Sequence, residues 1–352
     1  MNILKTLEAT GHKQVLFCQD EQTNLKAIIA IHDTSFGRAM GATRLWPYAS
    51  EEEALQDALR LSRGMSYKAA CANIPVGGAK GVIIAQPEEK TEEILTSYAR
   101  FVDSLKGLFI TGQDVNLCPE DVRLIGSHTP YVVGLTERSG GPAPITAKGV
   151  LVGIKTAVDF LWGTEDLTGL KVAIQGVGNV GKNLCQLLHE NGAEIWVTDL
   201  DTEKARKVES LYGAKVVPVE DIYSLEVDVF SPCGMGGIIN DLTIPNIQAK
   251  IIAGAGNNQL ENELAHSQLL KEQNILYCPD YVINSGGLIN VYNELIGYDE
   301  EKALKMLDNI GHTLFDIFHR AREQNITAYE AANFIAEERV AKARKDFLAI
   351  NY

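Results

Sequence analysis

Hydrophobic positions along the first 140 residues follow two different periods. In residues 51–67 and 91–105, apolar side chains stand three and four positions apart among charged ones, which predicts amphipathic helices. Short, continuous apolar runs predict buried strands at residues 14–18, 25–32, 81–85 and 108–111. Strands and helices mixed in this way predict a compact α/β unit.

The second half of the chain alternates more regularly. A helix predicted over residues 146–161 leads into a series of short apolar runs separated by helical stretches. This alternation predicts a parallel, doubly wound sheet, with strands at residues 172–175, 195–198, 216–218, 227–230 and 251–253. Two long amphipathic helices are predicted at residues 300–322 and 329–348.

Glycine and proline mark the expected boundary between these halves. Residues 139–144 contain two of each and break both periods. We therefore predict a first domain over residues 1–143 and a second over residues 144–323. A C-terminal helix, residues 324–352, is expected to pack back on the first domain.

Charge narrows the range of partners. The 32 Lys and Arg residues against 46 Asp and Glu give a net charge of −14, which repels phosphate backbones and anionic lipids, so no nucleic-acid or membrane partner is expected. No apolar run nears the roughly 20 residues of a membrane span, and residues 1–13 lack the hydrophobic segment of a secretion signal. We expect a cytoplasmic location.

The six cysteines and seven histidines show no metal-ligand spacing, so we expect reduced thiols and no bound metal.

A glycine motif follows the first strand of the second half. Gly176-Val177-Gly178-Asn179-Val180-Gly181 is a G-x-G-x-x-G between a predicted strand and a predicted helix. The glycines permit a tight turn, close approach of a pyrophosphate and close helix packing, so the motif predicts dinucleotide binding. Asp199 ends the next strand, where a carboxylate would accept from ribose hydroxyls and repel a 2′-phosphate; this favours NAD over NADP. Lys204 and Arg206 could instead hold a 2′-phosphate, although a solvated helix surface is the expected role for both.

Two lysines stand on either side of a glycine-rich segment in the first half. Lys68 ends a predicted helix, and Lys80 follows Gly77-Gly78-Ala79, which we interpret as a bend. A lysine in this apolar setting has few carboxylates to pair with, and a neighbouring ammonium would lower its pKa enough for it to act as a base. The alternative is that both are solvated surface lysines beside a turn.

Together these segments resemble the leucine, phenylalanine and valine dehydrogenases, which are NAD-dependent enzymes that oxidatively deaminate L-amino acids. The resemblance runs from about residue 12 to 345 and also includes residues 41–44, 110–115, 257–260 and 279–287. Four segments are most similar in sequence to the tryptophan-oxidising members, namely residues 40–44, 70–75, 110–116 and 140–146. The resemblance implies an N-terminal α/β substrate domain and a Rossmann NAD domain, with catalysis in the cleft between them.

The resemblance also implies roles for individual residues. Lys68 and Asn258, with the backbone at Gly41, would hold the substrate α-carboxylate, and Lys80 would activate water. Asp114 would contact the amino group and shuttle its proton. The cofactor would be held by the glycine motif, Asp199, Thr146 and Asn284, the last beside the nicotinamide. Alternatively, Asp114 only caps a turn and Asn284 only shapes a loop. Ala42 and Ala79 replace glycines common in the family, which puts the geometry of those two segments in doubt.

The positions that match the family's side-chain pocket carry no charge. They are Met40, Met65, Gly112, Leu288 and Val291. The relatives that use glutamate have a lysine at Met40, so its absence argues against an acidic substrate. Gly112 is alanine in leucine-preferring members, and the missing methyl group would leave room for an aromatic ring. Alternatively, the methionines are ordinary core packing and Gly112 serves only the backbone.

We therefore expect NAD-dependent, reversible oxidation of a bulky apolar L-amino acid, above all L-tryptophan, to its 2-oxo acid, indole-3-pyruvate, with release of ammonia and NADH. L-phenylalanine, or L-leucine and L-valine, are the alternative substrates. A non-catalytic dinucleotide-binding regulator is the alternative from another class. A 2-hydroxy acid dehydrogenase would need a histidine and arginine pair that is not evident. A homo-oligomer, a dimer or larger, is expected.

Overall fold

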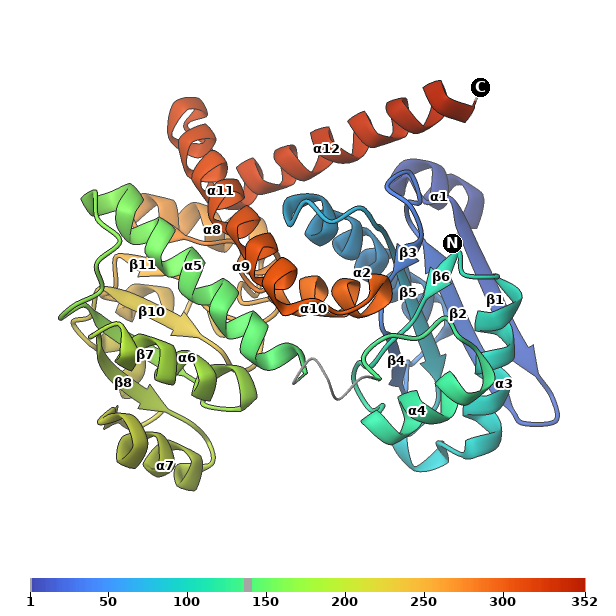
Figure 1. Cartoon of the computed structure of the whole chain (residues 1–352), viewed down its shortest axis with the longest axis horizontal. Helices are drawn as coiled ribbons and strands as arrows, with labels where there is room; N and C mark the ends of the chain where they lie inside the picture. Colours follow the sequence, from blue (N-terminus) through green and yellow to red (C-terminus); the bar gives the residue numbers. More distant parts are fainter. Residues whose placement is uncertain (1, 136–140, 352) are drawn as a thin grey trace. The chain divides into compact units, whose positions relative to one another are not determined.

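The computed structural model describes residues 2–135 and 141–351, with only the backbone at 350 and 351. The chain forms two compact units (Figure 1). Unit 1 comprises Met1–Arg138, Glu294–Gly297 and Ala336–Tyr352, and unit 2 comprises Ser139–Asn293 and Tyr298–Ile335. Of the glycine- and proline-rich stretch expected at the boundary, Ser139 and Gly140 lie outside the described residues.

Unit 1 is built on a sheet of order β1-β2-β5-β3-β6, with β4 paired to β5. The first three strands are antiparallel, whereas β3, β4 and β6 run parallel to their neighbours. The four predicted strands are confirmed, and the sequence pattern missed β3 and β4. The strands are β1 (Gln14–Asp20), β2 (Leu25–Ile31), β3 (Ala39–Met40), β4 (Thr43–Trp46), β5 (Gly77–Ile84) and β6 (Phe109–Ile110).

Helices cover both faces of this sheet, which explains why β2 is continuously apolar and buried from Ala27 to Ile31. Leu25, Ile29 and Ile31 pack in one core cluster with residues of α3 and α4, whereas Ile28 and Ala30 pack in a second cluster with residues of α2. The predicted helices are confirmed. The helical elements are α1 (Ile3–Thr10), α2 (Glu51–Cys71), η1 (Pro87–Glu89), α3 (Glu92–Ser104) and α4 (Pro119–His128).

The same alternation determines where Lys80 points. In β5, Ala79 and Ile83 belong to the cluster on the α3 and α4 face, and Val82 belongs to the cluster on the α2 face. Because successive side chains in a strand point to opposite faces, Lys80 points with Val82 toward α2. A lysine is thereby placed in the interior of the unit, where it is buried.

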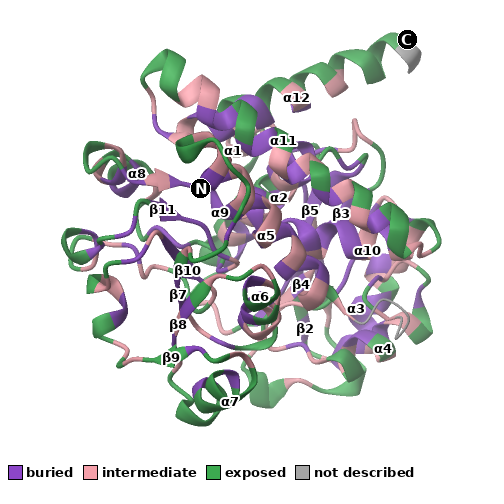
Figure 2. Ribbon diagram, turned by 60° about the vertical axis from the view of Figure 1, so that its left-hand side comes forward, coloured by how far each residue is buried: buried purple, intermediate pink, exposed green. Residues whose placement is uncertain are grey.

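Unit 2 contains the predicted doubly wound sheet, in the order β12-β11-β10-β7-β8-β9 with all strands parallel. The strand order reverses beside β7, between β7 and β10, which is where open α/β sheets bind ligands. Figure 2 shows strands of this sheet buried and the outer face of α7 exposed. The strands are β7 (Lys171–Gln175), β8 (Glu194–Thr198), β9 (Lys215–Val216), β10 (Val229–Pro232), β11 (Ile251–Ile252) and β12 (Leu276–Tyr277), the last not predicted.

The helices of unit 2 begin inside the predicted boundary stretch. Two prolines of that stretch form the first turn of α5, where a missing backbone N–H costs no hydrogen bond, so the helix starts at Pro142 rather than at Thr146. The helical elements are α5 (Pro142–Trp162), α6 (Asn179–Glu190), α7 (Thr202–Tyr212), η3 (Asp221–Ser224), η4 (Ile244–Asn246), α8 (Glu263–Glu272), α9 (Asp280–Ile283), α10 (Gly286–Ile296) and α11 (Glu300–Gln324).

The C-terminal helix, α12 (Ala328–Asn351), joins unit 1 from residue 336 onward, as predicted. Arg339 Nη1 donates to the carbonyl oxygens of Ala70 and Cys71 at the end of α2, at 3.0 and 3.1 Å. Arg344 Nε binds the buried carboxylate of Asp33 at 2.5 Å. Among the described residues, no helix is long and apolar enough to cross a membrane.

Candidate functional site

The glycine motif forms the turn between β7 and α6, as predicted. Gly176 has a left-handed backbone (φ 92°) and packs on Gly234 at the end of β10, where an added Cβ would lie 2.9 Å from that residue's Cα. A Cβ at Gly181 would lie 2.0 Å from the carbonyl oxygen of Gly176, so only glycine lets α6 approach the turn. A Cβ at Gly178, by contrast, would meet no atom within 4 Å. The turn therefore fits a dinucleotide pyrophosphate, which needs open space at the second glycine and a helix N-terminus facing it.

Asp199 follows β8 and is tied to this turn. Its Oδ2 accepts from the backbone N–H of Val177 at 2.7 Å, and its Oδ1 accepts from Asp201 at 2.9 Å. Each oxygen keeps a lone pair, so the carboxylate can still accept from ribose hydroxyls. Of the two cations that could hold a 2′-phosphate, Lys204 is paired with Asp201 at 3.4 Å and Arg206 is exposed on α7.

A second polar group in unit 2 surrounds Asn284, which caps α9. Its Nδ2 donates to the carbonyl oxygen of Ala255 at 3.2 Å and to Asn257 Oδ1 at 2.7 Å. Its Oδ1 is buried and accepts no hydrogen bond from a described residue, although a buried acceptor without a donor is costly. An amide donor of a bound group, such as a nicotinamide carboxamide, would satisfy it. A contact of Asn284 with the cofactor stays a prediction.

The other predicted residues of unit 2 are described by their backbone conformation, hydrogen bonds and burial. Asn258 has a left-handed backbone (φ 51°), which fixes the turn after Asn257. Thr146 is buried in α5 and donates to the carbonyl oxygen of Pro142 at 2.8 Å. In α10, Leu288 is buried and Val291 half-buried.

In unit 1 the predicted residues gather around the start of β5. Gly41 N–H donates to the carbonyl oxygen of Ile110 at 3.0 Å, and a Cβ on Gly41 would lie 1.6 Å from the carbonyl oxygen of Ala79. Gly41 is therefore the residue type that lets β3 pass beside Lys80. Gly112 accepts from the N–H of Thr43 at 3.0 Å and so lies in the same group of strand ends.

The Lys80 ammonium forms a short ion pair with Asp114 Oδ2, and the two side chains are 7% and 23% exposed. Burial lowers the pKa of Lys80, and this effect outweighs the nearby Asp114 carboxylate, which raises it. Burial also opposes ionisation of Asp114, but the Lys80 ammonium and the Arg44 guanidinium hold the pKa of that carboxyl below its usual range. The pair combines a lysine that loses its proton more easily than usual with a carboxylate that stays charged.

Four expectations about this segment and its partner need correction. Gly77 and Gly78 do not form a bend; they lie in β5, where a Cβ would lie 1.7 Å from the carbonyl oxygen of Asp33 and 2.2 Å from the backbone nitrogen of Ser66, respectively. Lys80 does have a carboxylate partner, which lies 34 residues away in the sequence. The first cause of its lowered pKa is burial, with Arg44 as the neighbouring cation that adds to it. Asp114 is an ion-pair partner rather than only a turn cap.

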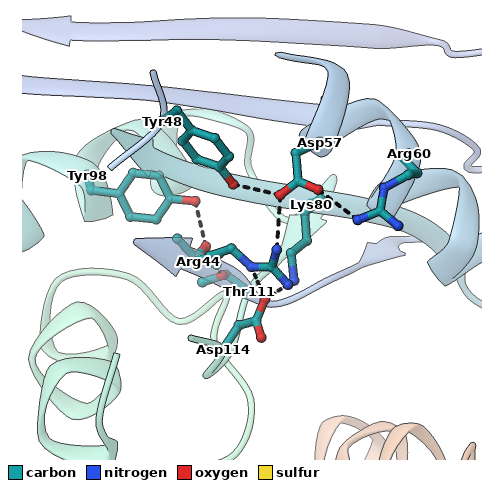
Figure 3. A network of polar contacts seen from close by, with 9 residues as sticks. Arg44, Tyr48, Asp57, Arg60, Lys80, Tyr98, Thr111 and Asp114 are labelled. Atoms are coloured by element: carbon teal, nitrogen blue, oxygen red, sulfur yellow. Dashed lines mark hydrogen bonds and ion pairs between the residues drawn. The ribbon is translucent and has the colours of Figure 1, made fainter. Parts of the chain in front are cut away.

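Sequence reasoning missed a further part of this group (Figure 3). Arg44 Nε lies 3.3 Å from Asp114 Oδ2, and its Nη1 lies 3.0 Å from Asp57 Oδ2. Tyr48 donates to the same Asp57 oxygen at 2.7 Å, and Arg60 binds Oδ1 of Asp57 at 3.0 Å. The only sequence signal was that Arg44 belonged to one of the segments that carry the family resemblance.

The remaining predicted positions of unit 1 differ in burial. Lys68 lies half-buried in the last turn of α2, and Met65 is half-buried one turn before it. Met40 is 2% exposed in β3. A Cβ on Gly112 would lie 3.3 Å from the carbonyl oxygen of Val133 and 3.4 Å from its Cγ2, so an added methyl group would press on Val133. Ala79 is fully buried within β5.

All six cysteines are free thiols, and among the described residues no group of three or more His, Cys, Asp or Glu side chains is placed to hold a metal ion.

Comparison with known proteins adds independent evidence. The family profile described as "Glu/Leu/Phe/Val dehydrogenase, dimerisation domain" matches residues 12–131, and that described as "Glutamate/Leucine/Phenylalanine/Valine dehydrogenase" matches residues 139–201 and 196–347. An L-tryptophan dehydrogenase from Nostoc punctiforme is 61% identical over 98% of each chain. A leucine dehydrogenase from Geobacillus stearothermophilus is 48% identical, over 99% of this chain and 96% of the relative. A crystal structure of L-tryptophan dehydrogenase from Nostoc punctiforme matches with a TM-score of 0.90 and 59% identity, over 97% of this chain and 99% of that one.

Proposed function

Because the chain belongs to the glutamate/leucine/phenylalanine/valine dehydrogenase family and is an amino acid dehydrogenase, we propose that it oxidatively deaminates L-tryptophan with NAD. The products are indole-3-pyruvate, ammonia and NADH, and the reaction is reversible. The observation that carries the proposal is the buried Lys80–Asp114 pair, which offers a base and a proton acceptor at one place. The alternatives of a 2-hydroxy acid dehydrogenase and a non-catalytic regulator are set aside.

Each proposed step uses side chains of the chain. Lys68, Asn258 and the Gly41 backbone hold the α-carboxylate, so that the Cα–H bond has a fixed direction. A bound nicotinamide supplies the acceptor for the hydride that leaves Cα. Asp114 takes a proton from the amino group as the C=N bond forms. Lys80, in its neutral form, takes a proton from the water that attacks Cα, and ammonia then leaves as the C=O bond forms.

Unit 2 supplies the cofactor site in this proposal, and unit 1 supplies the reacting groups. Dehydrogenases of this family usually depend on nicotinamide dinucleotides, and NAD rather than NADP is our proposal. Its support is Asp199, whose carboxylate would repel a 2′-phosphate, and the pairing of Lys204 with Asp201. Residues 176–181, Thr146 and Asn284 complete the proposed cofactor contacts.

The proposed substrate is apolar because no charged side chain stands at the positions matched to the pocket. Met40, Met65, Gly112, Leu288 and Val291 make up this set. L-tryptophan is supported by the 61% identical L-tryptophan dehydrogenase, and L-phenylalanine and L-leucine remain alternatives, since phenylalanine and leucine dehydrogenases are 46% and 48% identical relatives. A homo-oligomer and a cytoplasmic location stay predictions.

The test is a panel of L-amino acids with NAD and with NADP, followed by NADH or NADPH absorbance. The proposal predicts that kcat/KM is highest for L-tryptophan with NAD and lowest for L-glutamate. D-tryptophan and L-tryptophan without nucleotide are the controls. Turnover that is confined to aliphatic amino acids would overturn the substrate assignment, and a preference for NADP would overturn the cofactor assignment.

A further inference from the structure

Arg44 bridges two carboxylates in unit 1 (Figure 3). Its Nε binds Asp114 and its Nη1 binds Asp57, so two separate N–H groups of one planar guanidinium are held. Tyr48 and Arg60 fix Asp57 from two further directions. A planar group held at two of its donors has a fixed orientation, which a lysine ammonium could not provide.

The fixed guanidinium acts on the same oxygen as the proposed base. The Nε of Arg44 and the ammonium of Lys80 both contact Oδ2 of Asp114. Two cations on one oxygen orient the carboxylate, and neither of these two ion pairs uses its Oδ1. In the proposed reaction, Oδ1 is then the oxygen available to the substrate amino group.

The charges that act on Lys80 come from three elements and alternate in sign. Asp114 follows β6, Arg44 lies on β4, and Asp57 lies on α2, the helix toward which Lys80 points. Arg44 disfavours the Lys80 ammonium, and Asp57 and Asp114 favour it. The side chains of Arg44 and Asp57 are 23% and 15% exposed, so solvent screens them only in part.

We propose that Arg44 and Asp57 are positioning residues: Arg44 orients the Asp114 carboxylate toward the reacting groups, and Asp57 balances the charge of Arg44 at Lys80. The proposal rests on the assigned dehydrogenase chemistry, and it adds two residues that need not touch the substrate. Arg44 thus has two functions. Its planar shape orients the Asp114 carboxylate, and its charge adjusts the pKa of Lys80.

These two functions predict shifts of opposite sign. In the oxidative direction, kcat/KM rises with pH as Lys80 loses its proton. Asp57→Asn leaves the Arg44 charge unbalanced, which should move this rise to lower pH by about half a unit to one unit. Arg44→Gln removes a positive charge near Lys80 and should move the rise to higher pH by a similar amount. A residue with a merely structural role would lower the rate without opposite shifts.

The experiment measures pH profiles of kcat/KM for L-tryptophan oxidation between pH 6 and 11. Arg44→Lys keeps the charge but loses the planar fork, so it should keep the wild-type profile while kcat falls about tenfold or more. Arg123→Gln and Asp103→Asn are the matched controls, because each removes one member of an ion pair elsewhere in unit 1 whose cation is exposed. Both controls should keep the wild-type profile and rate.

The outcomes distinguish failure of the proposed function from failure of this inference. Wild-type protein without amino acid oxidation would refute the proposed function. The effect of Arg44 and Asp57 on the Lys80 pKa would then be measured by NMR titration of 13Cε-lysine-labelled protein, with Lys80→Arg to assign the signal. Opposite shifts for Asp57→Asn and Arg44→Gln support the proposal. Equal shifts, no shifts, or an Arg44→Lys variant with full kcat would overturn it. If Asp57→Asn does not fold, Asp57→Ser, which also removes the carboxylate and leaves the Arg44 charge unbalanced, is the second variant and should shift the profile in the same direction.

Discussion

Replacing Asp114 with Asn tests the buried ion pair most sharply. The Lys80 side chain is 7% exposed and lies on a strand between two helix-covered faces, so most of it is shielded from bulk water. Without its carboxylate partner the ammonium is a buried charge beside Arg44. The protein can avoid the free-energy cost of this buried charge only if Lys80 loses its proton. The free energy of that deprotonation depends on pH.

The loss of stability in Asp114→Asn is limited by the free energy needed to deprotonate Lys80. A lysine has an ordinary pKa of about 10.4, and each unit is about 1.36 kcal/mol, so a neutral Lys80 costs at most about 5 kcal/mol at pH 7 and about 2 kcal/mol at pH 9. Breaking a buried pair while both charges remain costs about 3–5 kcal/mol. At pH 7 this is no more than the cost of deprotonating Lys80, whereas at pH 9 deprotonation costs less. A lysine whose pKa is lowered in the folded state binds fewer protons than in the unfolded state, so stability rises with pH in this window. Asp114→Asn should therefore lose about 3 kcal/mol or more at pH 7 and less than about 2 kcal/mol at pH 9.

Urea unfolding followed by circular dichroism at the two pH values measures the difference. Asp103→Asn is the matched control, because its lysine partner is 72% exposed and the loss of stability should be small and the same at both pH values. Adding Lys80→Met to Asp114→Asn removes the buried cation and should recover most of the loss at pH 7. An equal loss at pH 7 and pH 9, or a loss no larger than that of the control, would refute the reasoning.

Three further substitutions test the cofactor and pocket assignments. Gly181→Ala forces a Cβ against a backbone oxygen at 2.0 Å and should lower both the thermal midpoint and NAD affinity, whereas Gly178→Ala, with no atom within 4 Å of its Cβ, should lower only NAD affinity; calorimetry that finds the two alike would contradict this. Asp199→Ser should weaken NAD and raise the NADP to NAD ratio of kcat/KM, and an unchanged ratio would argue against the ribose contact. Gly112→Ala should shift kcat/KM from L-tryptophan toward L-leucine by about tenfold or more, through the methyl group's pressure on Val133; an unchanged ratio, with circular dichroism confirming the fold, would rule out this gate.

The Rossmann unit was predictable because its signals are local. Gly176 to Gly181 carry the turn, and the strand before them and the helix after them are continuous in the sequence. The strands that were missed, β3, β4 and β12, span two to four residues, too short for a period to be visible.

The candidate site of unit 1 was only partly predictable, because its contacts are long-range. Lys80 and Asp114 could be singled out as residues, but the sequence does not show that they pair or that Lys80 is buried. Arg44 reaches Asp114 across 70 positions and Asp57 across 13. Gly77 and Gly78 suggested a bend because glycine is usual in turns, whereas here it allows backbone and helix to approach a strand.

The role of Lys80 in oxidative deamination is tested by the product balance of the wild-type enzyme and of Lys80→Ala. With L-tryptophan and NAD, the wild type should form NADH, ammonia and indole-3-pyruvate in equal amounts. Lys80→Ala should bind NAD as the wild type does, because residues 176–181 lie in the other unit, and its turnover should fall at least about a hundredfold. NADH formed without ammonia, or a folded Lys80→Ala variant that oxidises L-tryptophan at near wild-type rate, would contradict the account.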